Sequence, residues 1–261
     1  MGYLYKKLIK KIYMDLANYN FVTSQIGTFN TTSTIANNIA NVNTPGYKQD
    51  QMVFEKYLTQ DVNKKNTMPL DRATIVDIKQ GSMRQTNREL DFALNGDVFF
   101  ALETPLGVRY SRAGNFTINS QYELTNPSGY RVLGANGDPI VFNQDDTMIM
   151  IDHEGVIFAR KTAQDNFNER GKLEIVAIED PRALRKAGDN LFLVEGNTAV
   201  VQADPATYNI LQGFLEDGNV IPITSMTHLV ELQHKSAAVV NLTQQIDNVN
   251  INLYKTLAKV E

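Results

Sequence analysis

The residues able to perform acid–base or metal chemistry are few in this chain. Its three histidines are His153, His228 and His234, and it has no cysteine, so disulfides and thiolate chemistry are excluded. His228 and His234 fall on different faces of a predicted helix, because they lack the i, i+4 spacing with which two helical histidines share a metal. We therefore expect no metal ion and no other cofactor.

The carboxylates give only a weak indication of catalysis. Asp91 and Asp97 both lie near predicted strands, where two carboxylates can act as the acid and base of a glycosidase. The pairs Asp145-Asp146 and Asp152 with Glu154 lie in turn-rich segments, where solvation explains them. No Ca²⁺-binding loop, phosphate-binding loop or Gly-x-Ser-x-Gly motif is present. We expect no catalytic residue and no small-molecule substrate, and a carboxylate-pair hydrolase remains an alternative.

Composition excludes further classes of protein. The chain has 261 residues, 25 basic and 29 acidic, and a net charge of -4, which argues against a nucleic-acid partner. Hydrophobic residues make up 43% of it, enough for a sizeable core. No apolar run reaches the ~18 residues of a membrane-spanning helix. The basic start of the chain is not followed by the apolar run of a secretory signal, so any export should proceed without a cleaved signal peptide.

The N-terminal segment has a charge-free helical pattern. No charged residue occurs between Leu16 and Tyr47, and Asn and Thr are unusually frequent there. Apolar and small residues recur in alternating steps of three and four, the spacing of a helix seam. Pro45 and Gly46 then predict a turn that ends the helix. The residues of this segment that we expect to form an interface are Val22, Ile26, Phe29, Ala36, Asn37, Asn38, Ala40, Asn41, Asn43, Thr44, Gly46 and Tyr47.

The C-terminal segment has a second seam. Helical spacing begins near Ile223, and no charge occurs from Ser236 to Ile246. A water-facing helix side normally has Lys and Glu, so the charge-free stretches of the two terminal helices indicate burial against other subunits. Helices that cover the β-domain of a monomer are the alternative. The expected interface residues here are Leu229, Leu232, Val239, Leu242, Ile246, Val249 and Leu253.

Between the helices the pattern changes to short strands and turns. Runs such as 91–102, 107–118 and 172–178 mix β-branched and aromatic residues, and Gly- and Asn-containing turns separate them. We expect an α+β fold with long N- and C-terminal helices, coiled-coil-like on assembly, that flank a central β-rich domain. The expected divisions are an N-terminal extension at 1–13, a helix at 14–46, an extended connector at 47–90, a β-rich domain at 91–218 and a helix at 219–261.

Three blocks resemble a known family. The string IANNIANVNTPGYK (35–48) closely resembles the N-terminal signature of bacterial flagellar rod and hook proteins. LDFALNGDVFF (90–100), followed by YSRAGNFTIN (110–119), resembles the central β-domain of that family. GFLEDGNVIPITSM (213–226) resembles the segment that leads into its C-terminal helix. Val98 and Tyr122 depart from the pattern, because the family usually has glycine at these positions.

The resemblance implies a structural role. It predicts a subunit of the flagellar basal-body rod that spans the periplasm, transmits torque from motor to hook, serves motility and contacts other rod subunits and the export apparatus. Chain length, a single β-domain and the GDNLF motif (188–192) favour the proximal rod over the distal rod. A secreted β-rich binding or adhesion module is the alternative outside the family. Residues 1–13 match nothing in it and indicate an upstream start codon or a basic extension that touches membrane.

Overall fold

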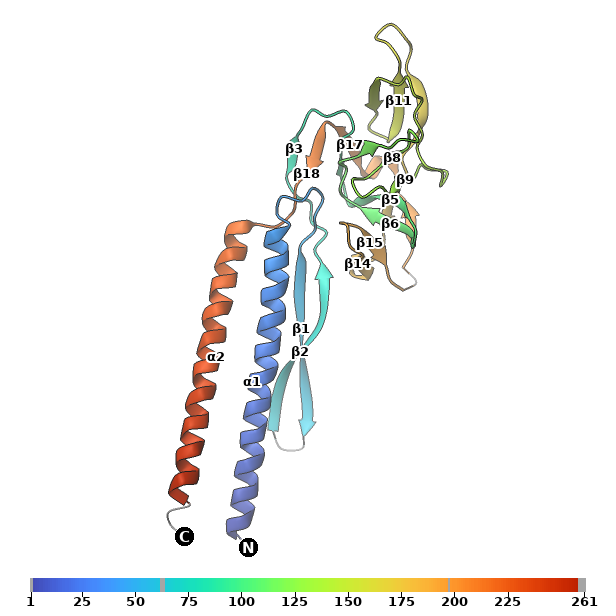
Figure 1. The fold of residues 1–261 in the computed structure, drawn as a ribbon. Helices are drawn as coiled ribbons and strands as arrows, with labels where there is room; N and C mark the ends of the chain where they lie inside the picture. The colour runs from blue at the N-terminus through green and yellow to red at the C-terminus, as the bar shows by residue number, and fades with distance from the viewer. Residues whose placement is uncertain (1, 62–63, 197, 258–261) are drawn as a thin grey trace. The chain divides into compact units, whose positions relative to one another are not determined.

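The computed structural model describes residues 2–61, 64–196 and 198–257, with side chains described outside 2–20, 54–73, 250, 253–254 and 256–257 (Figure 1). Its two helices lie at the two ends of the described chain: α1 spans Gly2–Ala40 and α2 spans Pro222–Leu257. No helix in the described part is long and apolar enough to cross a membrane.

Short strands connect the two helices. Strands β1 and β2 form a two-stranded sheet of their own, and most of the later strands belong to a nine-stranded and a three-stranded sheet. The strands are β1 (Asp50–Asp61), β2 (Lys64–Val76), β3 (Met83–Gln85), β4 (Phe92–Asn95), β5 (Val98–Thr104), β6 (Gly107–Ser111), β7 (Thr117–Ile118), β8 (Leu124–Thr125), β9 (Arg131–Val132), β10 (Met148–Ile151), β11 (Val156–Arg160), β12 (Asn168–Lys172), β13 (Ile175–Ile178), β14 (Leu184–Lys186), β15 (Phe192–Val194), β16 (Val200–Gln202), β17 (Asn209–Gln212) and β18 (Phe214–Glu216). Two 3₁₀ turns, η1 (Pro181–Ala183) and η2 (Pro205–Thr207), precede β14 and β17.

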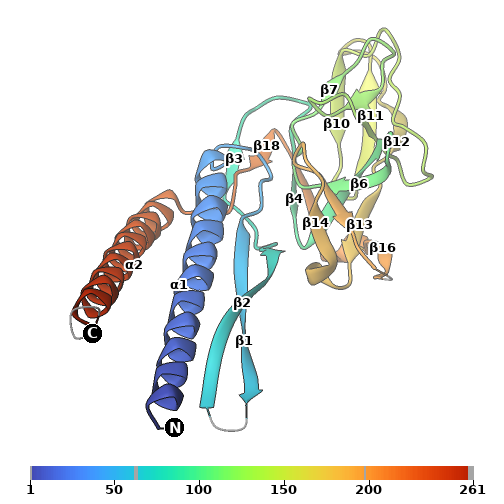
Figure 2. The same cartoon turned by 60° about the horizontal axis from the view of Figure 1, so that its bottom comes forward.

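The chain divides into two compact units. One, which we call the helical unit, comprises residues 1–39, 52–74 and 222–261, and therefore both helices and most of the β1–β2 hairpin. Within it α1 lies between α2 and the hairpin in both views (Figures 1 and 2). The other, the β-rich body, comprises residues 40–51 and 75–221. The hairpin and β3 occupy much of the segment 47–90.

The expected fold class is wrong in its arrangement. We expected coiled-coil-like helices that flank a central β-rich domain. The structure instead has a large β-rich body of many strands and only two helices in its described part, which belong to one unit with the hairpin. A coiled coil buries its seam against a partner helix, yet Val22, Ile26 and Phe29 of the expected α1 seam are exposed. Other faces of α1 are covered, because α2 lies on one side of the helix and the hairpin on another.

Helix α1 satisfies its many hydroxyl groups locally. Thr28, Thr31 and Thr32 each donate their Oγ1 hydroxyl to the carbonyl oxygen four residues earlier, at 2.8 Å. Such bonds make a threonine-rich helix tolerable without charged partners, although they do not stabilise it strongly. Packing must therefore supply most of the stability of α1.

The core of the β-rich body is built around β5. This strand pairs with β6, β9 and β13, and its residues Val98–Leu102 are all buried. Because side chains alternate across a strand, Phe100 joins one apolar cluster and Phe99 the other. Phe100 meets Phe116 edge-on at 5.1 Å between ring centroids, and Phe99 meets Phe192 in the same way at 5.9 Å. A strand covered on both faces explains the continuous apolar sequence.

The two departures from the family pattern have different consequences. Val98 is buried and is not among the described residues with positive φ, so a side chain is accommodated there. Tyr122 has φ 64°, a conformation that costs a non-glycine residue about 1–2 kcal/mol. The Tyr122 carbonyl nevertheless accepts a bond from the Phe142 amide at 2.8 Å, which helps to hold the turn.

Candidate assembly site

The three sequence blocks meet in one buried ion cluster. Lys48 from the first block, Arg112 from the second and Glu216 from the third are all fully buried. Lys48 Nζ lies 2.6 Å from Glu216 Oε1, and Arg112 Nε lies 3.1 Å from Glu216 Oε2. We refer to these three side chains as the ion cluster. It joins both ends of the β-rich body to its middle, over long separations in sequence.

Backbone carbonyls accept hydrogen bonds from both cations, although Arg112 Nε and Nη2 and Glu216 Oε2 have no hydrogen-bond partner within the described residues. Lys48 Nζ donates to the carbonyl of Lys79 at 2.7 Å, and Arg112 Nη1 donates to the carbonyls of Gly96 and Val98 at 2.7 and 2.6 Å. The Gly81 amide donates to Glu216 Oε1 at 2.8 Å. These oriented dipoles offset part of the cost of burying two cations beside a single carboxylate.

Burial acts on the ionisation of both cations. Loss of water lowers the pKa of the Lys48 ammonium and of the Arg112 guanidinium below their usual values, and attraction to Glu216 opposes this shift. Each cation therefore depends on Glu216, the only carboxylate in contact with either of them in the described structure. Removing one partner of such a buried cluster is strongly destabilising, because it leaves a buried charge without compensation.

The turn after α1 is held against the same cluster. The Gly46 amide donates to the Glu216 carbonyl at 2.7 Å, and Asn190 Nδ2 donates to the Pro45 carbonyl at 2.7 Å. Lys186 Nζ lies 3.9 Å from the centre of the Tyr47 ring, a cation–π contact, and 2.8 Å from Asp50 Oδ2. The GDNLF motif thus contacts the turn through Asn190.

Asn219 adds a second attachment between the two ends. Its Oδ1 accepts from the Gln49 amide at 2.7 Å, and its Nδ2 donates to the carbonyl of Asp77 at 2.8 Å. An asparagine amide can donate and accept at once, so one side chain fixes three segments of backbone.

Replacing Gly46 with alanine should destabilise the β-rich body. Gly46 has φ +67°, and a Cβ there would lie 2.3 Å from the Ala113 amide nitrogen, so the turn and the backbone at Ala113 must separate. Gly188 is the matched control, since its φ is +85° but a Cβ would meet nothing within 4 Å. Positive φ alone costs about 1–2 kcal/mol in either variant, and overpacking adds about 1–3 kcal/mol in Gly46→Ala. Denaturant unfolding measures the free energy of unfolding of both variants. Equal losses of stability would contradict the close approach of Gly46 to the backbone at Ala113.

The signature residues predicted as an interface differ in exposure. Asn38, Gly46 and Tyr47 are buried, Asn41 and Thr44 are partly buried, and Ala36, Asn37, Ala40 and Asn43 are exposed. Gly46 and Tyr47 therefore serve contacts inside the β-rich body, whereas the exposed residues lie at the surface of the described structure. The assignment of the exposed set to an interface remains a prediction.

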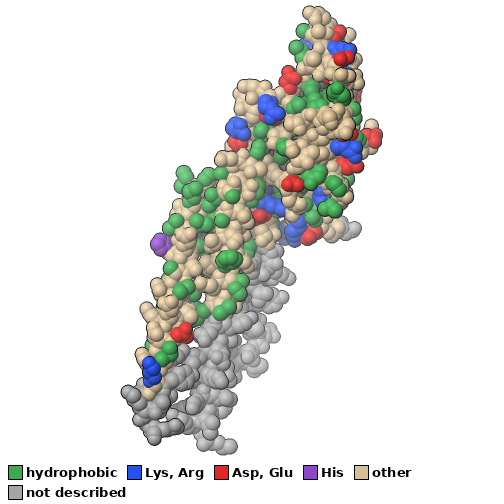
Figure 3. Space-filling view, viewed as in Figure 1, with side chains coloured by type: hydrophobic (Ala, Val, Ile, Leu, Met, Phe, Trp, Pro, Cys, Tyr) green, Lys and Arg blue, Asp and Glu red, His purple; other side chains and the backbone are tan. Residues whose placement is uncertain are grey.

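An uncharged apolar stripe runs along α1. Val22, Ile26 and Phe29 are 58%, 55% and 71% exposed, and we call these three residues the α1 stripe. Hydrophobic side chains gather along the described part of the helices, whereas most charged ones lie over the β-rich body (Figure 3). Exposed contiguous apolar surface of this kind marks interaction sites.

The predicted seam of α2 divides between two sides of the helix. Leu229, Leu232, Val239 and Ile246 are partly buried, whereas Leu242 and Val249 are exposed. The side chain of Leu253 lies outside the described residues. The half-buried positions continue through Ser236, whose Oγ accepts from Gln25 Nε2 of α1 at 3.4 Å.

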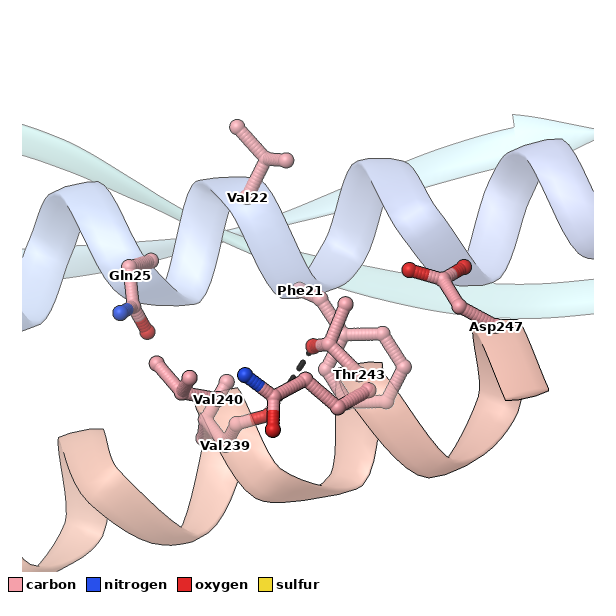
Figure 4. Close-up of a pocket in the computed structure, with 8 residues that line it drawn as sticks. Phe21, Val22, Gln25, Val239, Val240, Thr243 and Asp247 are labelled. Atoms are coloured by element: carbon pink, nitrogen blue, oxygen red, sulfur yellow. Dashed lines mark hydrogen bonds between the residues drawn. The ribbon is translucent and has the colours of Figure 1, made fainter.

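A groove lies between the two helices. It has a volume of about 410 Å³ and is lined by Phe21, Val22, Gln25, Val239, Val240, Thr243, Gln244 and Asp247 (Figure 4). Phe21 and Gln25 point toward α2, while Val22 points away from it, so the groove borders the α1 stripe (Figure 4). Thr243 Oγ1 is occupied by the Val239 carbonyl at 2.9 Å.

Most of the candidate chemical groups are exposed. The three histidines and Asp97 are exposed. Asp91 is buried, and its Oδ1 lies 3.3 Å from Arg88 Nη1. Within the described residues no group of three or more His, Cys, Asp or Glu could hold a metal ion. Sequence reasoning missed the roles of Lys48 and Arg112, although charged residues inside three apolar blocks were a usable signal.

Comparisons with known proteins identify the class. A family model described as flagella basal body rod protein matches residues 30–48, and one described as flagellar hook protein FlgE/F/G D1 domain matches residues 93–159. Both matched regions contribute to the site, the first through Lys48 and the second through Arg112.

Similar relatives cover nearly the whole chain. The flagellar basal-body rod protein FlgG of Borreliella burgdorferi is 31% identical over 237 residues, 83% of this chain and 89% of the relative. The flagellar basal-body rod proteins FlgF of Mesorhizobium japonicum and Caulobacter vibrioides are each 29% identical, over 92% and 95% of this chain and 96% and 100% of the relatives. This chain belongs to the flagellar basal-body rod protein family, whose members are structural proteins and not enzymes.

Proposed function

We propose that this chain is a structural subunit of the flagellar rod, which transmits torque from motor to hook and is needed for motility. Membership of the family places it in the basal body among other axial subunits. The observation that carries the proposal is the exposed apolar surface on the charge-free stretch of α1, the α1 stripe. Such a surface is stable when neighbouring subunits cover it.

The finer position of the subunit is also part of the proposal. We assign the chain to the proximal rod, within the span of the periplasm, with the distal rod as the alternative. Chain length and the GDNLF motif favour the proximal position, and the contact of Asn190 with the Pro45 turn gives that motif a structural role. We propose passage through the flagellar export apparatus, because the uncharged stretches of the two terminal helices suit subunits that become ordered on assembly.

The proposal predicts a location and a phenotype. Basal bodies purified from the source bacterium should contain the full chain, and deletion of its gene should stop rod completion and swimming. Restoring the gene should restore both, which excludes effects on neighbouring genes. Absence of the chain from basal bodies, together with normal swimming of the deletion strain, would refute the rod function.

A further inference from the structure

Two segments from opposite ends of the β-rich body, 46–49 and 216–219, lie side by side. The hydrogen-bonded pairs that connect them are Gly46 with Glu216, Lys48 with Glu216, Tyr47 with Asn219 and Gln49 with Asn219. The separation in sequence between partners is nearly constant, 168 residues for Lys48 with Glu216 and 170 for Gln49 with Asn219. The two segments therefore run parallel, since in an antiparallel pair the separation changes by about two for each residue.

A third segment, 77–82, lies against both of the others. The bonds that hold it run from the Asp77 amide to the Gln49 carbonyl, from Lys48 Nζ to the Lys79 carbonyl, from the Gly81 amide to Glu216 Oε1, from the Asp217 amide to the Ser82 carbonyl and from Asn219 Nδ2 to the Asp77 and Lys79 carbonyls. A Cβ at Gly81 would lie 2.0 Å from the Asp217 carbonyl oxygen, so only a glycine allows this close approach. We call the three segments the clamp.

The terminal helices connect directly to the clamp. Helix α1 ends at Ala40, shortly before the first segment, and α2 begins at Pro222, shortly after the last one. A load on α1 pulls the first segment toward its own start, and a load on α2 pulls the last segment toward its own end. Because the two segments run parallel, these pulls are opposite along one axis and load the bonds between them in shear, all at once.

Burial strengthens the bonds that carry this shear. Lys48 and Glu216 are both fully buried, and their contact at 2.6 Å is a charge-assisted hydrogen bond. Water cannot easily replace such a bond as it stretches, and the low dielectric of the interior increases its strength. A peeled pair of strands, in contrast, loses its bonds one at a time.

We infer that the clamp sets the mechanical strength of the β-rich body. This inference rests on the proposed function, since a subunit that transmits torque carries load through its terminal helices. The lifetime of a protein under force depends on its unfolding rate, and therefore on the bonds that break on the way to the transition state. Asn219 contacts both of the other segments, so its removal should weaken the clamp without leaving a buried charge unpaired.

Single-molecule force spectroscopy on the full-length chain tests the clamp. The chain has no native cysteine, so handles attach only at the engineered sites Asn43→Cys and Ile221→Cys, which are exposed and flank the clamp. At constant force, Asn219→Ala should shorten the lifetime of the folded body by at least about tenfold, because three hydrogen bonds of the loaded segments are lost.

The matched control is Asn119→Ala. Asn119 also makes three side-chain hydrogen bonds, which join it to Gln121 and Glu123 in a turn outside the clamp. Its removal should shorten the lifetime by less than about threefold in the same geometry, because these bonds do not carry the shear. Denaturant unfolding of both variants separates this effect from a loss of equilibrium stability.

A second pair of handles changes the direction of the load. Leu106→Cys and Gln164→Cys are exposed sites, and the chain between them contains no clamp residue. In this geometry Asn219→Ala should change the lifetime by less than about twofold.

Equal shortening by Asn219→Ala and Asn119→Ala, under load across the clamp, would overturn the inference. Equal shortening by Asn219→Ala in both geometries would overturn it also. If Asn219→Ala does not fold, Gln49→Ala repeats the test, because it removes the 3.0 Å bond from Gln49 Nε2 to Asp77 Oδ2 between two clamp segments. These outcomes concern the purified chain and leave the proposed rod function intact, which basal-body composition and swimming test separately.

Discussion

A chain with Ile26→Asp should fold and yet fail to support swimming. Ile26 is exposed on α1, so in the free subunit the new carboxylate remains in water and costs only the lower helix propensity of Asp, roughly 0.5 kcal/mol. In the assembled rod the same carboxylate would be buried without a partner, which costs several kcal/mol. Each 1.4 kcal/mol weakens a contact about tenfold, and the loss recurs in every copy.

The measurement combines unfolding with function. The purified variant should unfold within about 1 kcal/mol of the wild type, while a strain that expresses it in place of the native chain should neither swim nor complete its rods. Ile26→Val keeps the apolar surface and should swim. Asn30→Asp adds the same charge one turn further along, at a partly buried position that is already polar, and should be milder. Normal swimming of Ile26→Asp would remove the α1 stripe from the interface, and unfolding of the β-rich body would place Ile26 in the core of the monomer.

Glu216→Gln should be the most destabilising single change in the β-rich body. The substitution keeps size and shape but leaves Lys48 and Arg112 buried without their shared carboxylate. Breaking a buried ion pair by removing one partner costs about 3–5 kcal/mol. The neighbouring Asp217→Asn is the matched control, because the Arg84–Asp217 pair is 52% and 28% exposed and should be worth at most about 1 kcal/mol.

Denaturant unfolding of both variants gives the comparison, and a double-mutant cycle tests the coupling. Lys48→Met alone removes one of the two cations and leaves Glu216 in a neutral pair with Arg112, beside the Gly81 amide. The double variant Lys48→Met/Glu216→Gln should therefore lose less stability than the sum of the two single losses, because each change removes the same contact. Equal losses for Glu216→Gln and Asp217→Asn, or a cycle without coupling, would contradict the role of the cluster.

Local patterns in the sequence determined the local structure. Pro45 and Gly46 predict a turn, and α1 ends at Ala40 just before it. The apolar run from Val98 predicts a strand, and β5 is found there. The three family blocks pointed to the rod family, which the relatives confirm. These inferences succeed because turn chemistry, strand propensity and motif identity depend on neighbours in sequence.

Only the tertiary structure decided how these elements meet. The spacing of apolar residues in α1 predicted a seam, but helical periodicity does not say which neighbour covers that face of the helix. In the structure the α1 stripe is exposed, whereas the seam of a coiled coil would be buried. The pairing of Lys48 with Glu216 joins residues 168 positions apart, and that of Arg112 with Glu216 joins different blocks. No local propensity encodes such partners, because a buried cation is tolerated only where the fold brings a carboxylate and carbonyl groups to it.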